Sequence, residues 1–216
     1  MPEWEEIAVQ QPKKPNKILS AIFTVIFVIL LAFLGARIYV SSTYGAVLVK
    51  GESMRNTLQG GEWLLMHLTE KGAKAERGDI VVLDVRNKEG ATAKEGYLIK
   101  RLIAIEGDKL YCKGGRIFIC YNGADNFVEL EEDYTYYSVG KSLYSFASYE
   151  TPYELGEGEI FYLGDNRQSS KDSQEEFETQ DGMILKETDI YGVVHEWAMT
   201  YQTPLRWLFL TETFFN

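Results

Sequence analysis

Gly51-Glu52-Ser53-Met54 marks the place where the chain changes character. Before it lies an apolar run from Ile18 to Ala36, and after it come short β-prone segments separated by glycine-bearing turns. Few long stretches with a helical period of 3.6 residues follow residue 44. The sequence therefore predicts one long N-terminal helix followed by a mainly β domain of the sandwich or barrel type.

The apolar run has 19 residues without a charge, and a helix of that length spans roughly 28 Å, close to the hydrocarbon core of a bilayer. The run extends to Val40 if the Arg37 side chain snorkels to the interface. Three lysines at 13–17 precede it, so the positive-inside rule places the N-terminus in the cytoplasm. We predict a single-pass protein of the cell membrane, with a cytoplasmic tail (1–17), a transmembrane anchor (18–40) and an extracytoplasmic domain (41–216).

Two other interpretations of the apolar run stay open. A cleaved signal peptide has the same polarity, but its apolar core is usually shorter. A buried helix of a soluble core would normally show a polar face. The retained anchor is the favoured prediction.

Seven segments of the domain have the apolar, β-branched or aromatic composition of strands. They are Ala46–Val49, Glu62–Met66, Asp79–Leu83, Tyr97–Ile99, the Tyr111–Tyr121 hairpin, Glu159–Leu163 and Ile190–Val194. Leu130–Pro152 is interpreted either as an exposed insertion or as a segment whose aromatic residues cover a small satellite core. The last apolar segment, Trp207–Phe215, is too short to span a bilayer and is predicted to pack on the domain or on a membrane surface.

Composition excludes some classes of function. The formal net charge of -10 disfavours a nucleic-acid partner, which needs clustered lysine and arginine. The two cysteines, Cys112 and Cys120, do not have the spacing of a metal site. If Gly114-Gly115 is a two-residue turn, Cys112 lies opposite Ile117 and the two thiols face opposite ways. A disulfide would then need a bulge or another register, and two free thiols are favoured.

Ser53 is a candidate nucleophile, and a serine hydroxyl needs a base. His67 and His195 are the only histidines, and neither lies near other catalytic signals. The Gly-x-Ser-x-Gly motif is absent because Met54-Arg55 follows the serine. A histidine base is therefore disfavoured.

A lysine serves as the base when burial keeps its amine neutral. Lys100 follows the apolar run Tyr97-Leu98-Ile99, and lowering a lysine pKa from about 10.4 to near 8 costs roughly 3 kcal/mol. From spacing alone, a strand-end lysine with its amine in solvent is the simpler interpretation. The polar segment Gly164–Ser173 is compatible with a supporting loop or with an ordinary turn.

Four segments together resemble the bacterial type I signal peptidases, the leader peptidase family. The first has Ser-Met-x-Pro-Thr-Leu in the family, and the third has Lys-Arg followed by Pro-Gly-Asp. In this chain the segments are Gly51–Leu58, Arg77–Val82, Lys100–Asp108 and Gly164–Ser173, in the family's order. The resemblance implies a signal-peptidase-like β fold, similar to that of the self-cleaving repressor proteases.

The resemblance also implies roles for individual residues. Ser53 takes the position of the nucleophile and Lys100 that of the general base. Ser170 stands where a hydroxyl hydrogen-bonds the lysine amine, and Asp172 where the family has a structural acid. The backbone N–H of Ser53 would form the oxyanion hole, since Gly51 replaces a serine that some members use there.

The implied substrates are signal peptides of exported preproteins, cut after small residues of the Ala-x-Ala kind. We expect the substrate to lie as an added strand between Ala46–Gly51 and Tyr97–Lys100. The expected substrate-binding residues are Val49, Gly51, Leu98 and Ile99. No metal or organic cofactor is expected because the base is a side chain, and the expected partners are the signal peptide and the lipid bilayer, with the protein a monomer.

Three residues depart from the family's pattern: Asn56 and Glu106 replace prolines, and Gln174 replaces an arginine after Asp172-Ser173. Asn56 is predicted to loosen the turn after Ser53, and Gln174 leaves Asp172 without its usual ion-pair partner unless Arg167 or Lys171 substitutes. Two other functions stay open. One is an anchored β domain that binds partners without catalysis, and the other is a self-cleaving repressor protease, which carries a DNA-binding domain instead of an apolar anchor.

Overall fold

The computed structural model describes residues 16–88, 96–136, 146–174, 184–195 and 213–215. The chain divides into two compact units, residues 1–39 and residues 40–216. Helix α1 (Lys17–Thr43) is the one described helix that is long and apolar enough to cross a membrane. None of its residues is buried, and its large apolar side chains are exposed. The predicted N-terminal helix is present, and it ends three residues beyond the expected Val40.

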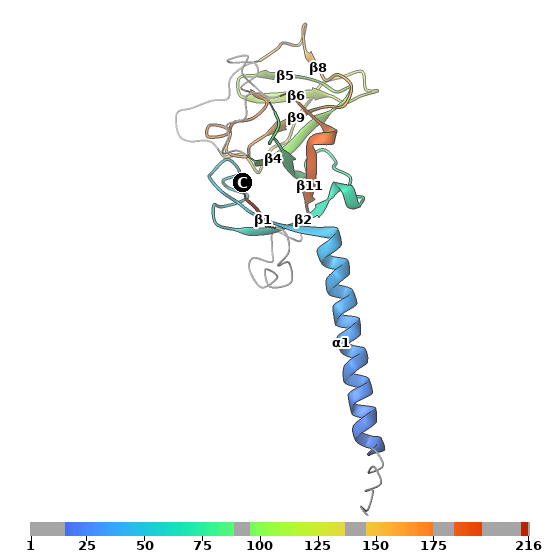
Figure 1. Cartoon of the computed structure of the whole chain (residues 1–216). Helices are drawn as coiled ribbons and strands as arrows, with labels where there is room; N and C mark the ends of the chain where they lie inside the picture. Colours follow the sequence, from blue (N-terminus) through green and yellow to red (C-terminus); the bar gives the residue numbers. More distant parts are fainter. Residues whose placement is uncertain (1–15, 89–95, 137–145, 175–183, 196–212, 216) are drawn as a thin grey trace, which may run out of the picture. The chain divides into compact units, whose positions relative to one another are not determined.

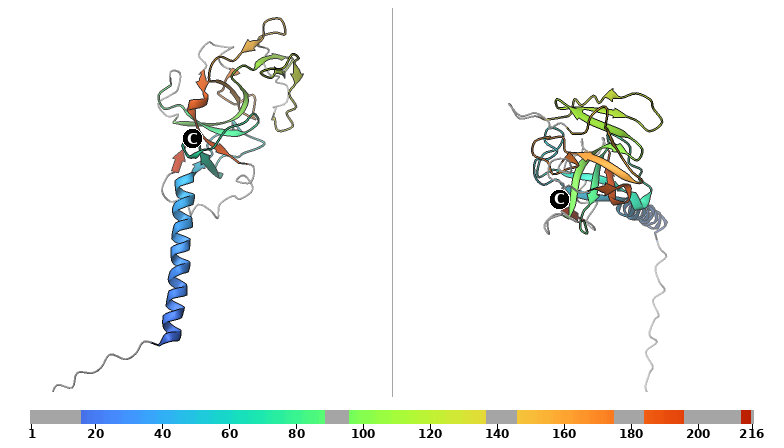
Figure 2. Two further views of the ribbon diagram at one scale, coloured as in Figure 1. Left: turned by 90° about the vertical axis from the view of Figure 1, so that its right-hand side faces the viewer. Right: turned by 90° about the horizontal axis from the view of Figure 1, so that it is seen from above.

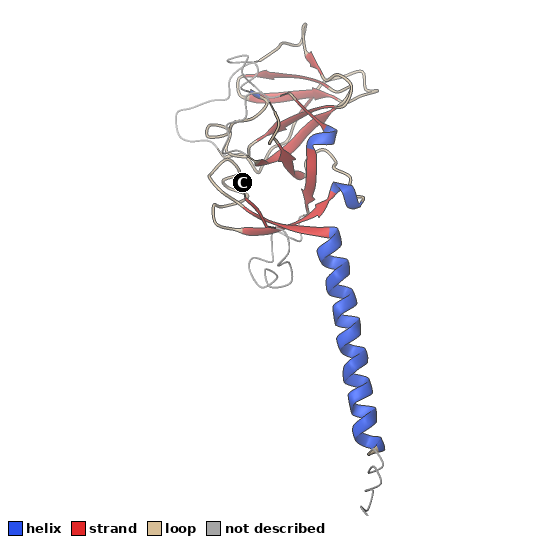
Figure 3. Ribbon diagram, in the orientation of Figure 1, coloured by secondary structure: helices blue, strands red, loops and turns tan. Residues whose placement is uncertain are grey.

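The remaining described elements are strands and two short 3-10 turns, which confirms the mainly β prediction (Figure 3). The larger sheet has eight strands, and all neighbours are antiparallel except the last pair. In spatial order they are β10 (Leu185–Lys186), β9 (Glu159–Leu163), β4 (Tyr97–Ile105), β3 (Ile80–Asp84), β11 (Ile190–Val194), β2 (Trp63–Leu68), β1 (Tyr44–Leu48) and β12 (Thr213–Phe215). The 3-10 turns are η1 (Thr69–Lys71) and η2 (Glu187–Asp189).

A second, four-stranded antiparallel sheet lies at the end of the β domain away from β1 and β2 (Figures 1 and 2). Its order is β7 (Val128–Glu129), β6 (Arg116–Cys120), β5 (Lys109–Lys113) and β8 (Tyr153–Glu154). The turn between β4 and β5 joins the two sheets. This turn is braced by the Arg77–Asp108 pair, in which the guanidinium donates to both carboxylate oxygens at 2.7 and 2.8 Å.

Strand β4 is the central element of the fold. Seven of its nine residues are buried, as expected for a strand covered on both faces. It contributes side chains to all three apolar clusters of the domain. The sequence predicted a strand ending at Ile99, but β4 continues to Ile105, so Lys100 lies within the strand and not at its end. Burial of this lysine is thus a consequence of the strand's length.

The β5–β6 hairpin has the predicted register, with Cys112 opposite Ile117. Both cysteines are free thiols, as favoured by the sequence. Burial raises the pKa of the Cys112 thiol to about 11, so this thiol is protonated at neutral pH. The segment 130–152, as far as it is described, packs on the core: Phe146 is buried and Tyr136 forms a β-bridge with Asn166.

Candidate active site

The loop that carries Ser53 is held by apolar side chains and by its own turn. Met54 and Leu58 are almost fully buried in the cluster formed by β1 and β2. The carbonyl of Met54 accepts hydrogen bonds from the backbone N–H groups of Thr57 and Leu58, at 3.1 and 2.8 Å. Because both sides of the serine are fixed, the half-buried Ser53 presents its hydroxyl from a defined backbone.

The hydroxyl of Ser53 meets the amine of Lys100. The Nζ atom of Lys100 lies 3.0 Å from Ser53 Oγ and 3.1 Å from the carbonyl oxygen of Ile99. Lys100 is only 3% exposed. Strands β4 and β1 are separated by three strands in the sheet order, so the larger sheet must curve to bring these two residues together.

The loop after β9 binds the back of the nucleophile loop. Asn166 donates its backbone N–H to the Ser53 carbonyl at 2.9 Å and its side-chain amide to the Glu52 carbonyl at 3.0 Å. Gly164 lies so close that a Cβ there would be 2.5 Å from the Ser53 carbonyl oxygen. The two loops therefore form one unit, which the sequence indicated only through the family resemblance.

Asp165 joins three parts of the site and was not predicted from the sequence. Its fully buried carboxylate accepts two hydrogen bonds from Arg101, at 2.8 and 2.5 Å, and one from the Thr57 hydroxyl at 2.5 Å. Arg101 follows the lysine on β4, and Thr57 belongs to the nucleophile loop. This carboxylate thus fixes the strand that carries Lys100 relative to the loop that carries Ser53.

Asp172 and Ser170 both lie beside Gly164, whose backbone adjoins the Ser53 carbonyl. The Asp172 carboxylate accepts hydrogen bonds from the backbone N–H groups of Gly164, at 2.9 Å, and Gln174, at 3.1 Å. Burial raises the pKa of Asp172, while these bonds, Ser170 and the charge of Lys100 act against that rise. The buried hydroxyl of Ser170 has no partner of normal hydrogen-bond geometry within the described ranges, so its predicted bond to the lysine amine stays a prediction.

Gln174, which stands where the family has an arginine, still contacts Asp172, because its backbone N–H donates to the Asp172 carboxylate. Arg167 instead forms a buried, bidentate ion pair with Glu132 and donates to the Gly164 carbonyl at 3.2 Å. Glu132 lies outside the four resembling segments, and nothing in the sequence pattern pointed to it.

The residues expected to bind substrate lie at the ends of β1 and β4. The side chains of Val49, Leu98 and Ile99 are buried, which leaves backbone contacts for a substrate, whereas Gly51 is exposed. Strand β12 pairs with Ala46–Leu48, so that part of the expected substrate edge is occupied in this structure. Gly51 and Val49 lie beyond the segment that β12 covers.

The two histidines lie away from the serine. His67 on β2 pairs with Tyr44, at the start of β1, whereas Ser53 follows the other end of that strand. The four residue steps from Tyr44 to Leu48 correspond to about 13 Å along β1. The His67 and His195 rings lie 5.7 Å apart and contact each other. This placement argues against a histidine base for Ser53.

Asn56 has a positive φ of 88° at the third position of the Met54–Thr57 turn. Type II turns require positive φ there, and asparagine and glycine supply it. The turn has both of its hydrogen bonds with asparagine in the place of proline. The loosening of this turn relative to a proline-containing one stays a prediction.

We expect Asn56→Pro to lower the free energy of unfolding by more than about 1 kcal/mol, because proline fixes φ near −65°. Asn56→Gly keeps the turn and is expected to cost less than about 1 kcal/mol. Thermal unfolding of both variants in detergent measures the difference. Equal stability of the two variants would contradict the positive φ at this position.

The raised pKa of Asp172 predicts a dependence of stability on pH. The folded state holds this proton more tightly than the unfolded state does, so the carboxyl favours folding most at low pH. That contribution is lost as the pH rises from the ordinary value of 3.8 through the raised pKa. The stability of the wild type relative to Asp172→Asn should therefore fall as the pH rises above 3.8. Chemical unfolding at several pH values tests this, with exposed Asp125→Asn as the control; a constant difference would contradict the prediction.

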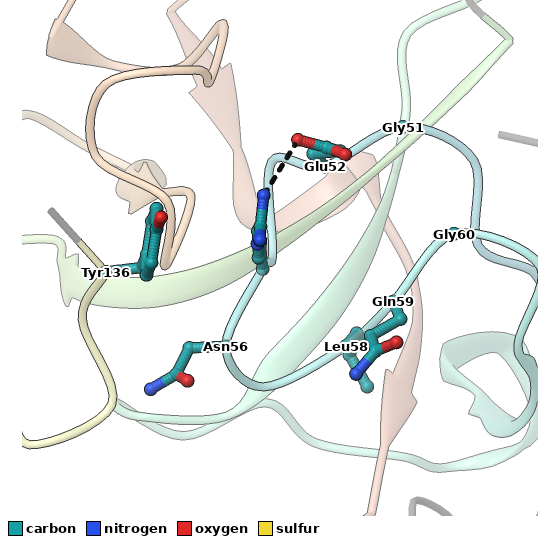
Figure 4. Close-up of a pocket in the computed structure, with 8 residues that line it drawn as sticks. Gly51, Glu52, Asn56, Leu58, Gln59, Gly60 and Tyr136 are labelled. Carbon is teal, nitrogen blue, oxygen red and sulfur yellow. Dashed lines mark hydrogen bonds and ion pairs between the residues drawn. The ribbon is translucent and has the colours of Figure 1, made fainter. Parts of the chain in front are cut away.

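A cavity of about 640 Å³ lies beside the nucleophile loop (Figure 4). It is lined by Gly51, Glu52, Arg55, Asn56, Leu58, Gln59, Gly60 and Tyr136. Among the described residues, no group of three or more histidine, cysteine, aspartate or glutamate side chains is arranged to hold a metal ion. The cavity therefore offers polar and charged groups for an organic or peptide ligand.

Comparison with known proteins places this chain in a family. Residues 19–198 match the family described as signal peptidase, peptidase S26. The chain is 32% identical over 170 residues to signal peptidase I of Bacillus licheniformis, which covers 74% of this chain and 80% of that protein. It is 31% identical over 166 residues to signal peptidase I T of Bacillus subtilis strain 168, covering 75% of this chain and 78% of that protein.

A solved structure of a signal peptidase I from Enterococcus faecalis V583 is similar as well, with 25% sequence identity and a TM-score of 0.41. The match covers 57% of this chain and 98% of that chain. The family match extends over most of the sequence, including every segment that forms the site around Ser53. The chain therefore belongs to the signal peptidase family, peptidase S26.

Proposed function

We propose that this protein is a membrane-anchored serine endopeptidase that removes signal peptides from exported preproteins, with Ser53 as nucleophile and Lys100 as general base. The observation that carries the proposal is the contact of 3.0 Å between Lys100 Nζ and Ser53 Oγ, made by a lysine that is 3% exposed. Burial disfavours the charged ammonium form, and a neutral amine accepts a proton. The family membership supplies the substrate class.

In the proposed reaction, the Lys100 amine takes the proton from Ser53 Oγ as this oxygen attacks the carbonyl carbon of the scissile bond. The C–N bond breaks, the protonated lysine returns its proton to the leaving amine, and the signal peptide remains as an ester on Ser53. Lys100 then takes a proton from water, whose oxygen attacks the ester. The bond between the acyl carbon and Ser53 Oγ then breaks, and the protonated lysine gives its proton to this oxygen. Both residues are thereby restored.

The negative charge that develops on the carbonyl oxygen needs a hydrogen-bond donor, and we assign this role to the backbone N–H of Ser53. One such donor contributes about 3 kcal/mol of transition-state stabilisation. Its direction depends on the nucleophile loop, which is held by Met54, Leu58 and Asn166. Asp172 and Ser170 are supporting residues that position the polypeptide behind the amine.

Helix α1 is proposed to anchor the enzyme, with its N-terminus in the cytoplasm and the β domain outside. The 27-residue helix has no buried residue, and a basic segment precedes it. An anchored enzyme and a preprotein held in the same bilayer diffuse in one plane. We further propose that it acts as a monomer and cuts after Ala-x-Ala-like sites.

The test is cleavage of a preprotein with an Ala-x-Ala site in detergent or liposomes by wild type and by Ser53→Ala, with the product sequenced from its N-terminus. Wild-type cleavage after the small residue, lost in Ser53→Ala, is the expected result. A folded wild type that cleaves none of several preproteins would overturn the proposal and favour a non-catalytic, anchored binding domain.

A further inference from the structure

The cavity of about 640 Å³ next to Ser53 has no part in the proposed proton transfers. Its size lies in the range of sites that hold small ligands or a few side chains. The wall is made by residues that precede and follow Ser53 in the chain and by Tyr136 from a distant part of the chain (Figure 4). Because its lining includes Glu52, the residue before Ser53, a ligand here would lie beside the loop that carries the proposed nucleophile.

Arg55 is the positively charged group of this cavity. Its Nη1 lies 3.5 Å from Glu52 Oε2, at the limit of hydrogen bonding, and its guanidinium carbon lies 5.0 Å from the centre of the Tyr136 ring. The ion pair is weak, because the two side chains are 52% and 67% exposed. The aromatic face and the carboxylate orient the guanidinium, which has five N–H donors and uses one in this contact.

The neighbouring groups suit a polar peptide ligand. Asn56 and Gln59 add side-chain amides to the cavity wall (Figure 4). Guanidinium and amide N–H groups recognise carboxylates through charge-assisted hydrogen bonds. Glu52, which carries the opposite charge, competes for Arg55 and limits the strength of that recognition.

The direction of the substrate decides which residues reach the cavity. In the proposed binding mode, residues before the cleavage site lie along Val49–Gly51, so the chain beyond the scissile bond continues past Ser53 towards Arg55. We propose, on the basis of the proposed function, that the cavity binds the first two residues after the cleavage site and that Arg55 selects acidic side chains there. Arg55 is thus a specificity-determining residue for the mature end of the preprotein.

The experiment uses two preproteins that are identical up to the cleavage site and carry either two glutamates or two lysines immediately after it. Wild type is expected to cleave the glutamate substrate with a kcat/KM about fivefold higher at low salt, the size of an exposed ion pair. The preference should shrink at high ionic strength. Arg55→Glu should reverse it, and Glu52→Gln, which frees Arg55 from its partner, should increase it.

Lys113→Glu is the matched control, since it changes the net charge equally at an exposed position on the β5–β6 hairpin. Lys113→Glu should retain the wild-type ratio of kcat/KM for the glutamate substrate to kcat/KM for the lysine substrate. A ratio that is unchanged in Arg55→Glu, or that shifts as far in Lys113→Glu, overturns the assignment of the cavity while the proposed function survives. If wild type shows no Ser53-dependent cleavage of either substrate, the proposed function fails and the cavity assignment fails with it.

Discussion

Replacing Lys100 by methionine is expected to lower kcat/KM for preprotein cleavage by about 10³-fold, the usual contribution of a positioned general base. Methionine keeps the length and apolar contacts of the side chain but removes the amine that lies 3.0 Å from Ser53 Oγ. Because the lysine amine is buried, its loss should leave the free energy of unfolding unchanged or increase it. Initial rates of cleavage and thermal unfolding of the same preparations measure both effects.

Lys109→Met is the control for the loss of a lysine, because this side chain is 43% exposed and pairs with Glu154 away from the site. Its kcat/KM should match that of the wild type. Full activity in Lys100→Met would show that another group takes the serine's proton. His67 and His195 would then have to be tested by substitution, despite their position at the far end of β1.

Gly164→Ala is expected to reduce activity by about 10²-fold or more, although glycine 164 has no reacting atom. The added Cβ would lie 2.5 Å from the Ser53 carbonyl oxygen and would overlap the hydroxyl of Ser170. Side chains can rotate away from such a contact, but the backbone of the nucleophile cannot do so without moving Ser53. A displacement of about 1 Å at a catalytic group costs roughly this factor in rate.

The same substitution should lower the free energy of unfolding by about 2 kcal/mol, as overpacking of a core does. Gly96→Ala is the matched control, because its Cβ would make an ordinary contact of 3.7 Å with Arg86. Steady-state kinetics together with urea unfolding separate the two effects. Wild-type kcat/KM in Gly164→Ala would mean that the two loops are not in contact in solution.

Ser53 and Lys100 were proposed as nucleophile and base because their segments resemble those of one family. The position of Lys100 within its strand was less predictable, since strand periodicity gives no reason to place a charged residue among buried ones. Only the complete β4, which packs on both faces, shows that the amine is enclosed. The family resemblance thus pointed to Lys100, while its residue pattern alone favoured an exposed amine.

The residues that connect the loops could not be predicted from local patterns. The hydrogen bond from Thr57 to Asp165 joins residues that are 108 positions apart. Glu132, the partner of Arg167, lies in a segment whose composition indicated only an insertion or a satellite core. Such contacts depend on how the curved sheet brings separate turns together, which residue spacing does not encode.

Strand β12 has a consequence for the order in which the molecule is completed during synthesis. It pairs in parallel with β1, so Ala46, near the beginning of the domain, aligns with Thr213 near its end. A ribosome must therefore have translated β12, far along the chain from β1, before this edge of the sheet acquires its neighbour. Until then β1 has one unprotected edge, and unprotected edges invite pairing with other chains. A chain that stops before Thr213 would leave every newly made copy in that condition permanently.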